Sequence, residues 1–247
     1  MLQFSSLSFS IGHKKIIDSI SCSIQKGDFI IVLGHNGAGK SSLFDLISGK
    51  RIATRGTIMF QNRDITQVSE IQRARFIGRL HQNPRNNVIS TMTVEENLAL
   101  SLYKDTYATL KGGKSRLTDQ FATLLSGLFS DTKTILKTKM KDLSGGQQQT
   151  IAALMITTHV PELLLLDEPT AALDPNAATQ VLQFLHKQIQ THQITTLLIT
   201  HDPYLAVHLG NKIWILERGK LKKEIDKTVQ KDIHPEQLIG HIAYEKL

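Results

Sequence analysis

A short apolar strand, a glycine-rich turn and a helix follow one another directly near the start of the chain, and this order constrains the fold more than any other feature. Residues 28–33 (DFIIVL) are mostly apolar and β-branched, which is typical of a strand buried on both faces. Residues 34–39 form the glycine-rich turn. A helical stripe of apolar residues then runs up to Gly49, a residue that can end a helix. Such a unit predicts an α/β sheet.

Later segments extend this pattern. Residues 163–166 and 195–199 predict two more buried strands, and residues 176–190 carry an apolar stripe with helical spacing between them. Residues 212–217 and 220–225 flank a glycine turn and predict a β-hairpin. Strands that alternate with helices imply a mainly parallel sheet covered on both faces.

The stretch between these halves has a different character. Residues 94–102 and 117–128 have helix-like spacing and few strand signals lie near them. We interpret residues 83–158 as a helical lobe of a single domain whose core lobe takes residues 1–82 and 159–225. A short C-terminal extension would follow.

Composition limits the class of protein. The longest apolar run, residues 151–156, is far shorter than the roughly 18 residues of a membrane-spanning helix, and the amino terminus does not resemble a secretory signal, so we expect a cytoplasmic protein. The single cysteine, Cys22, excludes an intramolecular disulfide and a thiolate-clustered metal site. The net charge of +7 favours an anionic partner such as a nucleotide, nucleic acid or a membrane surface.

The turn after the first strand carries the complete phosphate-loop pattern GxxxxGK[ST]. Its glycines allow backbone N–H groups to surround an anion, Lys40 can reach the terminal phosphates, and Ser41 can bind Mg²⁺. A glycine-rich turn with an unrelated lysine is the alternative, but it does not explain the position between a strand and a helix. We predict that the nucleotide is bound by Gly34, His35, Asn36, Gly37, Ala38, Gly39, Lys40, Ser41 and Ser42.

Two adjacent carboxylates follow the strand predicted at residues 163–166, at the edge where α/β sheets bind ligands. Asp167 suits the magnesium shell. Glu168 points the other way and can polarise the water that attacks the γ-phosphate. An Asp-Glu pair alone would usually be a solvated strand end, but beside a phosphate loop it predicts a hydrolytic site.

The sequence Leu143-Ser144-Gly145-Gly146-Gln147 is a second anion-binding helix start, with Ser144 as the N-cap. One phosphate loop suffices for one nucleotide. The economical interpretation is that the residues of this second motif clamp a phosphate held by another copy of the protein, namely Ser144, Gly145, Gly146 and Gln147.

The phosphate loop, LSGGQ, LLLLDEP and LLITHD occur in this order, and the chain up to about residue 225 resembles the ATP-binding cassette (ABC) ATPase family. The resemblance implies a P-loop NTPase core of mainly parallel sheet, an antiparallel β-region, and a helical lobe inserted between the phosphate loop and the signature motif. It also implies ATP and Mg²⁺ as cofactors, and a head-to-tail homodimer that encloses two ATP molecules.

The resemblance assigns further roles. Gln82 matches the glutamine that links the magnesium site to the helical lobe, and His201 matches the histidine that contacts the γ-phosphate. Taken alone, Gln82 would be an ordinary loop residue and His201 a structural one. Ile11 stands where the family usually has an aromatic residue that stacks on adenine, although Phe9 is nearby. We therefore expect modest affinity for the base.

The partners implied are an integral membrane permease and a substrate-binding protein, with the chain peripheral on the inner face of the cell membrane. Residues 82–84, 93–98 and 170–175 look closest to a branch associated with lipoprotein-dependent uptake of amino acids, including tryptophan. Import is thus expected, with an exporter subunit or a soluble ABC ATPase acting on nucleic acid as alternatives. The sequence has neither a heptad run nor a cysteine cluster, so we expect no nucleic acid partner.

Overall fold

The computed structural model describes residues 1–102, 114–227 and 233–240. The chain forms two compact units. The first unit comprises Met1–Arg79, Glu162–Glu168 and Gln193–Leu247, and the second unit comprises Leu80–Pro161 and Pro169–His192. Each unit has an apolar core of its own.

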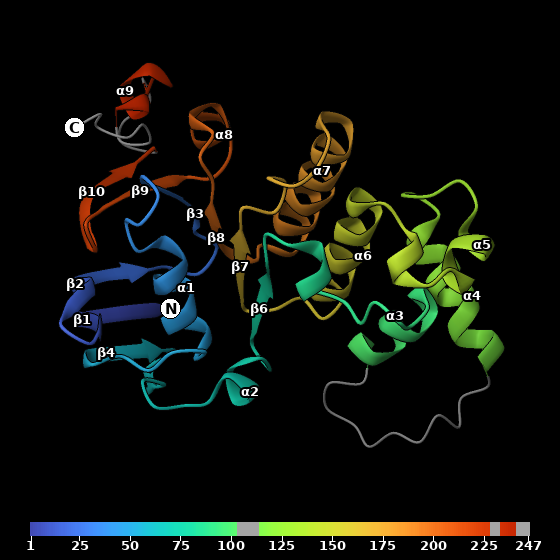
Figure 1. Cartoon of the computed structure of the whole chain (residues 1–247), viewed down its shortest axis with the longest axis horizontal. Coiled ribbons are helices and arrows are strands. Elements are labelled where there is room, and N and C mark those ends of the chain that lie inside the picture. Colours follow the sequence, from blue (N-terminus) through green and yellow to red (C-terminus); the bar gives the residue numbers. More distant parts are fainter. Residues whose placement is uncertain (103–113, 228–232, 241–247) are drawn as a thin grey trace. The chain divides into compact units, whose positions relative to one another are not determined.

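Two sheets make up most of the first unit (Figure 1). The four-stranded antiparallel sheet has the order β2 (Lys14–Ile24), β1 (Leu2–Ile11), β4 (Arg55–Phe60) and β5 (Arg63–Asp64). The six-stranded sheet has the order β10 (Lys220–Asp226), β9 (Lys212–Glu217), β3 (Phe29–Leu33), β8 (Thr195–Ile199), β7 (Leu163–Asp167) and β6 (Ile77–Leu80), and β6 ends where the second unit begins. The predicted mainly parallel sheet and antiparallel β-region are therefore both confirmed.

The central strands β3, β7 and β8 are buried along their whole length, as their continuous apolar runs predict. β3 lies parallel to β8, and β8 lies parallel to β7, with Ile31 opposite Leu198 and Leu165 opposite Leu197. β9 and β10 form the predicted hairpin. This register brings the carboxyl ends of β3, β7 and β8 to one edge of the sheet.

The first unit has four helices within the described residues: α1 (Lys40–Ser48), α2 (Glu70–Arg73), α8 (Pro203–His208) and α9 (Glu236–Ile239). Gly49 ends α1 as predicted, in the left-handed conformation. Arg73, only 1% exposed, donates hydrogen bonds of 2.8 Å to the carbonyl oxygens of Leu46 and Ile47 at that end. These bonds add donors at the end of the helix, where few helical N–H groups remain and, among the described residues, Leu46 otherwise accepts only from the Gly49 N–H group. They fix α1, whose first residue is Lys40.

The second unit is helical within the described residues. Its elements are η1 (Pro84–Asn86), α3 (Val94–Leu102), α4 (Lys114–Leu125), α5 (Thr132–Lys137), η2 (Met140–Asp142), α6 (Gly145–Thr157) and α7 (Pro175–His192). The predicted helical segments 94–102 and 117–128 correspond to α3 and part of α4. No helix among the described residues is both long enough and apolar enough to cross a membrane.

Helix α7 belongs to the second unit, because it packs closely on α6. A Cβ atom added at Gly146 in α6 would lie 2.5 Å from the Cβ atom of Ala177 in α7. The strand–helix alternation places residues 169–192 in the predicted core lobe. In the structure they join the helices instead. Part of the predicted C-terminal extension lies outside the described residues.

Candidate active site

The phosphate loop connects β3 to α1, and two of its glycines are required by the surrounding backbone. Gly39 has φ 103° at the N-cap of α1, and a Cβ atom there would lie 2.9 Å from the carbonyl oxygen of Ile16. A Cβ atom at Gly34 would lie 2.4 Å from the carbonyl oxygen of Leu216. The loop is thus packed between β2 and β9 in a conformation that only glycine adopts without strain at these two positions.

The side chain of Lys40 curls back over its own loop. Nζ donates hydrogen bonds to the carbonyl oxygens of Gly34 at 2.6 Å and His35 at 3.1 Å, and the residue is 6% exposed. Burial lowers the pKa of Lys40, while the carboxylates of Glu168 and Asp167 act in the opposite direction. A buried ammonium group with neutral carbonyl partners is well suited to bind phosphate oxygens, which carry charge.

A pocket of about 470 Å³ opens beside this loop. Its lining includes six of the residues predicted to bind nucleotide: His35, Gly37, Gly39, Lys40, Ser41 and Ser42. The pocket is also lined by Lys14, Lys15 and Arg218, which the sequence analysis did not predict. These residues lie at two hairpin turns far from the phosphate loop in the sequence, and no sequence pattern links those turns to the loop. The additional basic groups favour a polyanionic ligand.

Ile11 and Phe9, the two residues considered as contacts for adenine, are not among the described residues that line this pocket. Ile11 is 52% exposed at the end of β1. Phe9 is buried in the core of the first unit, and the guanidinium of Arg51 lies 5.3 Å from its ring centroid. Phe9 is therefore already covered on a face that adenine would need.

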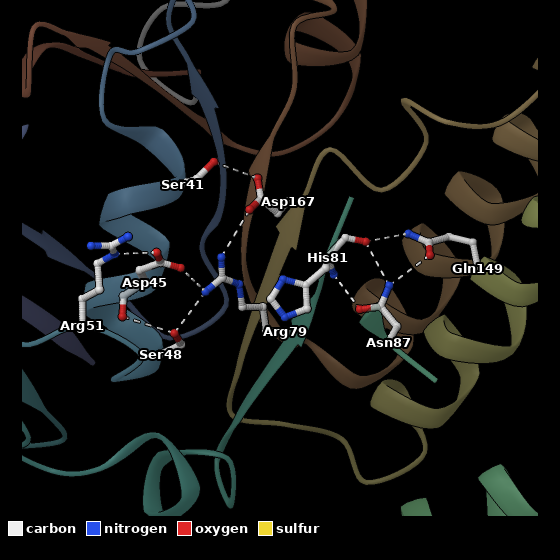
Figure 2. A network of polar contacts seen from close by, with 9 residues as sticks. All are labelled: Ser41, Asp45, Ser48, Arg51, Arg79, His81, Asn87, Gln149 and Asp167. Atoms are coloured by element: carbon white, nitrogen blue, oxygen red, sulfur yellow. Dashed lines mark hydrogen bonds and ion pairs between the residues drawn. The ribbon is translucent and has the colours of Figure 1, made fainter. Parts of the chain in front are cut away.

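Ser41 and Asp167 meet at the edge of the sheet (Figure 2). Ser41 Oγ donates a hydrogen bond of 3.4 Å to Asp167 Oδ1, although the two residues are far apart in the sequence. A hydroxyl and a carboxylate oxygen at this separation are hard oxygen ligands of the kind Mg²⁺ prefers, and Mg²⁺ commonly needs only one or two protein oxygens besides phosphate and water. The residues present fit the predicted metal site.

Glu168 and His201 also lie in contact. His201 Nε2 lies 2.6 Å from Glu168 Oε1. This contact brings together a residue that follows β7 and a residue that follows β8. Glu168 has φ 47°, in the left-handed region that non-glycine residues seldom adopt, and its N–H group donates to the carbonyl oxygen of Ile199 at 3.1 Å. Such a backbone is often retained at functional sites, and here it turns a carboxylate toward a histidine.

This arrangement of phosphate loop, carboxylates and histidine can be compared with known proteins. A family model described as ABC transporter matches residues 17–171. The chain belongs to the ABC transporter family. It is an ATP-binding subunit with ATPase activity coupled to transport.

Several ABC proteins are similar over most of this chain. The tyrosine transport ATP-binding protein of Clostridioides difficile is 33% identical over 249 residues, covering 99% of each chain. The macrolide export ATP-binding/permease protein MacB of Campylobacter jejuni is 33% identical over 251 residues, which are 96% of this chain and 37% of the relative. A solved dimeric ABC cassette in a post-hydrolysis state with ADP and phosphate is 25% identical, with a TM-score of 0.76 over 92% of this chain and 98% of that chain.

In the second unit, the ABC signature begins helix α6. Ser144 Oγ accepts a hydrogen bond from the Gln147 N–H group at 3.2 Å, and Gln147 Oε1 accepts one from the Ser144 N–H group at 3.0 Å. The predicted N-cap is thus confirmed as a reciprocal capping box. Gly146 is buried against Ala177, whereas a Cβ atom at Gly145 would make only an ordinary contact with Leu173. Local structure alone therefore accounts for part of this motif.

Gln82 is exposed in the same unit, directly after His81. Asn87 pairs with His81 through two hydrogen bonds, accepting from its N–H group at 2.8 Å and donating to its carbonyl oxygen at 2.9 Å (Figure 2). The fully buried Gln149 of α6 donates to the carbonyl oxygens of His81 at 3.1 Å and Pro169 at 3.0 Å. The segment that carries Gln82 is therefore fixed to the signature helix.

Proposed function

We propose that this ABC subunit powers the import of an amino acid through a separate membrane permease supplied by a substrate-binding protein. The observation that carries the proposal is the end-to-end similarity to a tyrosine transport ATP-binding protein, with 99% of both chains covered. MacB, which is named as an exporter and as a permease, is matched over only 37% of its length. The full-length match supports amino-acid transport, and the similarity to a methionine import ATP-binding protein supports import. The subunit would act beside its permease on the inner face of the cell membrane.

The first unit would perform the chemistry. Lys40 and the backbone N–H groups of residues 34–42 would bind the ATP phosphates, and Ser41 and Asp167 would hold Mg²⁺. When bound, Mg²⁺ would neutralise charge on the phosphates. Glu168 would accept a proton from the attacking water, and His201, 2.6 Å from Glu168, would contact the γ-phosphate.

The second unit would complete the site from another copy of the chain. Ser144, Gly145, Gly146 and Gln147 of one copy would close on the phosphates held by the other, giving a head-to-tail homodimer with two ATP molecules. Gln82 would sense the γ-phosphate and the metal and pass the change to its own unit. Ile11 would lie against adenine, and no nucleic acid would be bound.

Reconstitution in liposomes tests the proposal. The permease, the binding protein and this subunit are combined, and uptake of labelled amino acids is measured along with ATP turnover per subunit. We expect uptake driven by ATP, and a higher turnover than for the isolated subunit, because the permease raises the effective concentration of the two copies. Extrusion without uptake would instead indicate an exporter. Equal turnover in both states, together with crosslinking to DNA, would indicate a soluble ABC ATPase.

A further inference from the structure

One buried arginine touches the carboxylate predicted to bind magnesium. Arg79 lies on β6, and its side chain is 9% exposed. Nη1 donates to Asp45 Oδ1 of α1 at 2.7 Å and to Ser48 Oγ at 3.2 Å, while Nη2 donates to Asp167 Oδ2 of β7 at 3.3 Å (Figure 2). Arg79 therefore joins three elements of the first unit by contacts that depend on charge.

The contacts divide the two oxygens of Asp167 between two partners. Oδ2 accepts from Arg79, and Oδ1 accepts from Ser41. A carboxylate held at one oxygen by a guanidinium cannot rotate freely about its Cβ–Cγ bond. The oxygen nearest the phosphate-loop serine, Oδ1, is thereby kept facing Ser41.

Of the two carboxylates that contact Arg79, Asp45 is the closer, at 2.7 Å against 3.3 Å for Asp167. Asp45 neutralises Arg79 at the shorter distance, and Arg51 contacts the other oxygen of Asp45 at 3.1 Å from a more exposed position. Arg79 Nε is buried without a hydrogen-bond partner among the described residues. An arginine placed only for stability would be expected to satisfy this donor, because an unpaired buried N–H group is costly.

We propose that Arg79 is a positioning residue for the metal-binding carboxylate, holding Asp167 so that Oδ1 faces Ser41, with Asp45 fixing the guanidinium from α1. This inference rests on the proposed roles of Ser41 and Asp167. Removal of a residue that holds a metal ligand in place without touching the metal commonly lowers metal affinity by about 10- to 100-fold. A purely structural arginine would alter stability without altering the response to Mg²⁺.

Calorimetric titration of the full chain with ADP, in excess Mg²⁺ and in EDTA, separates the two roles. The measured quantity is the ratio of the two affinities. We expect Arg79→Met to lower this ratio by about tenfold or more and to leave the affinity in EDTA close to native. Arg79→Lys should lower the ratio by less than Arg79→Met, because one ammonium cannot reproduce the two separate contacts of Nη1 with Asp45 and Nη2 with Asp167. The matched control is Arg51→Met, which removes a cation from Asp45 without touching Asp167 and should leave the ratio unchanged.

Since Arg79→Met leaves two carboxylates near each other without their guanidinium, a second variant is needed. Arg79→Met combined with Asp45→Asn removes the cation and one carboxylate charge together, and thermal melts followed by circular dichroism verify that it is folded. We expect this double variant to keep the lowered ratio. A native ratio in the double variant, or in folded Arg79→Met, would overturn the inference. If Asp167→Asn also kept the native ratio, the proposed metal site itself would be wrong.

Discussion

The two units fix their functional residues by different chemistry. In the first unit, Asp167 and Glu168 are held by charged or titratable partners, Arg79 and His201. In the second unit, the segment containing Gln82 is held by neutral amide groups, those of Asn87 and Gln149. Charged contacts respond to a bound cation, to phosphate and to salt, whereas amide–carbonyl bonds respond mainly to geometry. The contacts that hold Asp167 and Glu168 therefore depend on ligand charge and on salt, whereas those that hold the Gln82 segment depend mainly on geometry.

The largest effect is expected where the first unit performs chemistry. Glu168→Gln should lower ATP turnover by about 100- to 10,000-fold, because the amide cannot accept the proton from water. ATP binding should persist, so that the variant accumulates as a closed dimer in size-exclusion chromatography with Mg-ATP. Native turnover in this variant would remove Glu168 from the role of base.

Lys40→Ala should weaken ADP binding by about a hundredfold or more, since it removes a buried cation that bonds to phosphate. Calorimetry measures the loss. Lys15→Ala is the matched control, because Lys15 lines the same pocket but is exposed and paired with Asp18. Equal losses in the two variants would show that general positive charge, and not the position of Lys40, determines affinity.

The second unit should respond to loss of an amide. Gln149→Leu leaves the carbonyl oxygens of His81 and Pro169 and the Asn87 amide without this partner, and should destabilise the chain by about 2–4 kcal/mol in denaturant titrations. Gln148→Leu, which removes a single bond to the Leu143 carbonyl, should cost about 1 kcal/mol. ADP affinity of folded Gln149→Leu should stay close to native, because the residues that line the phosphate-loop pocket belong to the first unit. A large decrease would show that the segment around His81 contributes to ADP binding.

A smaller effect on stability should distinguish Gly146 from Gly145, the two glycines of the signature. Gly146→Ala places a Cβ atom 2.5 Å from that of Ala177, so α6 or α7 must shift, and we expect a loss of about 1–3 kcal/mol in unfolding free energy. Gly145→Ala meets only an ordinary contact at 3.8 Å and should be close to neutral. Identical stabilities would mean that the α6–α7 contact is not tight. Any loss of ATP turnover in stable Gly145→Ala would then report on phosphate binding.

The smallest effect concerns adenine. Ile11→Tyr should tighten ATP binding by about 1 kcal/mol, or roughly fivefold, by supplying a π-face at an exposed position. Binding of ATP and GTP to the native chain should differ only modestly. Because Phe9 is buried beneath Arg51, it cannot substitute for the tyrosine. An unchanged affinity would mean that the base does not reach the side chain at position 11.

Much of the first unit follows from the sequence, but the four-stranded sheet does not. In β1, the alternation of Leu2 and Phe4 is out of step with that of Leu7 and Phe9, because a bulge at Ser6, with φ 48°, shifts the register. A strict period of two therefore fails across the bulge. Strand β6 escaped prediction for another reason, since its four residues include a glycine and an arginine.

The sequence by itself determined the features that depend on neighbouring residues: the phosphate loop, the buried strands β3, β7 and β8, and the capping box of α6. Each is a local pattern whose cause lies within a few residues. Only the tertiary structure decided that Arg79 faces Asp45 and Asp167, that Gln149 binds His81, and that α7 packs on Gly146. These contacts join residues distant in the chain, and a side chain that can pair with many partners acquires one only when the fold excludes the others and removes water.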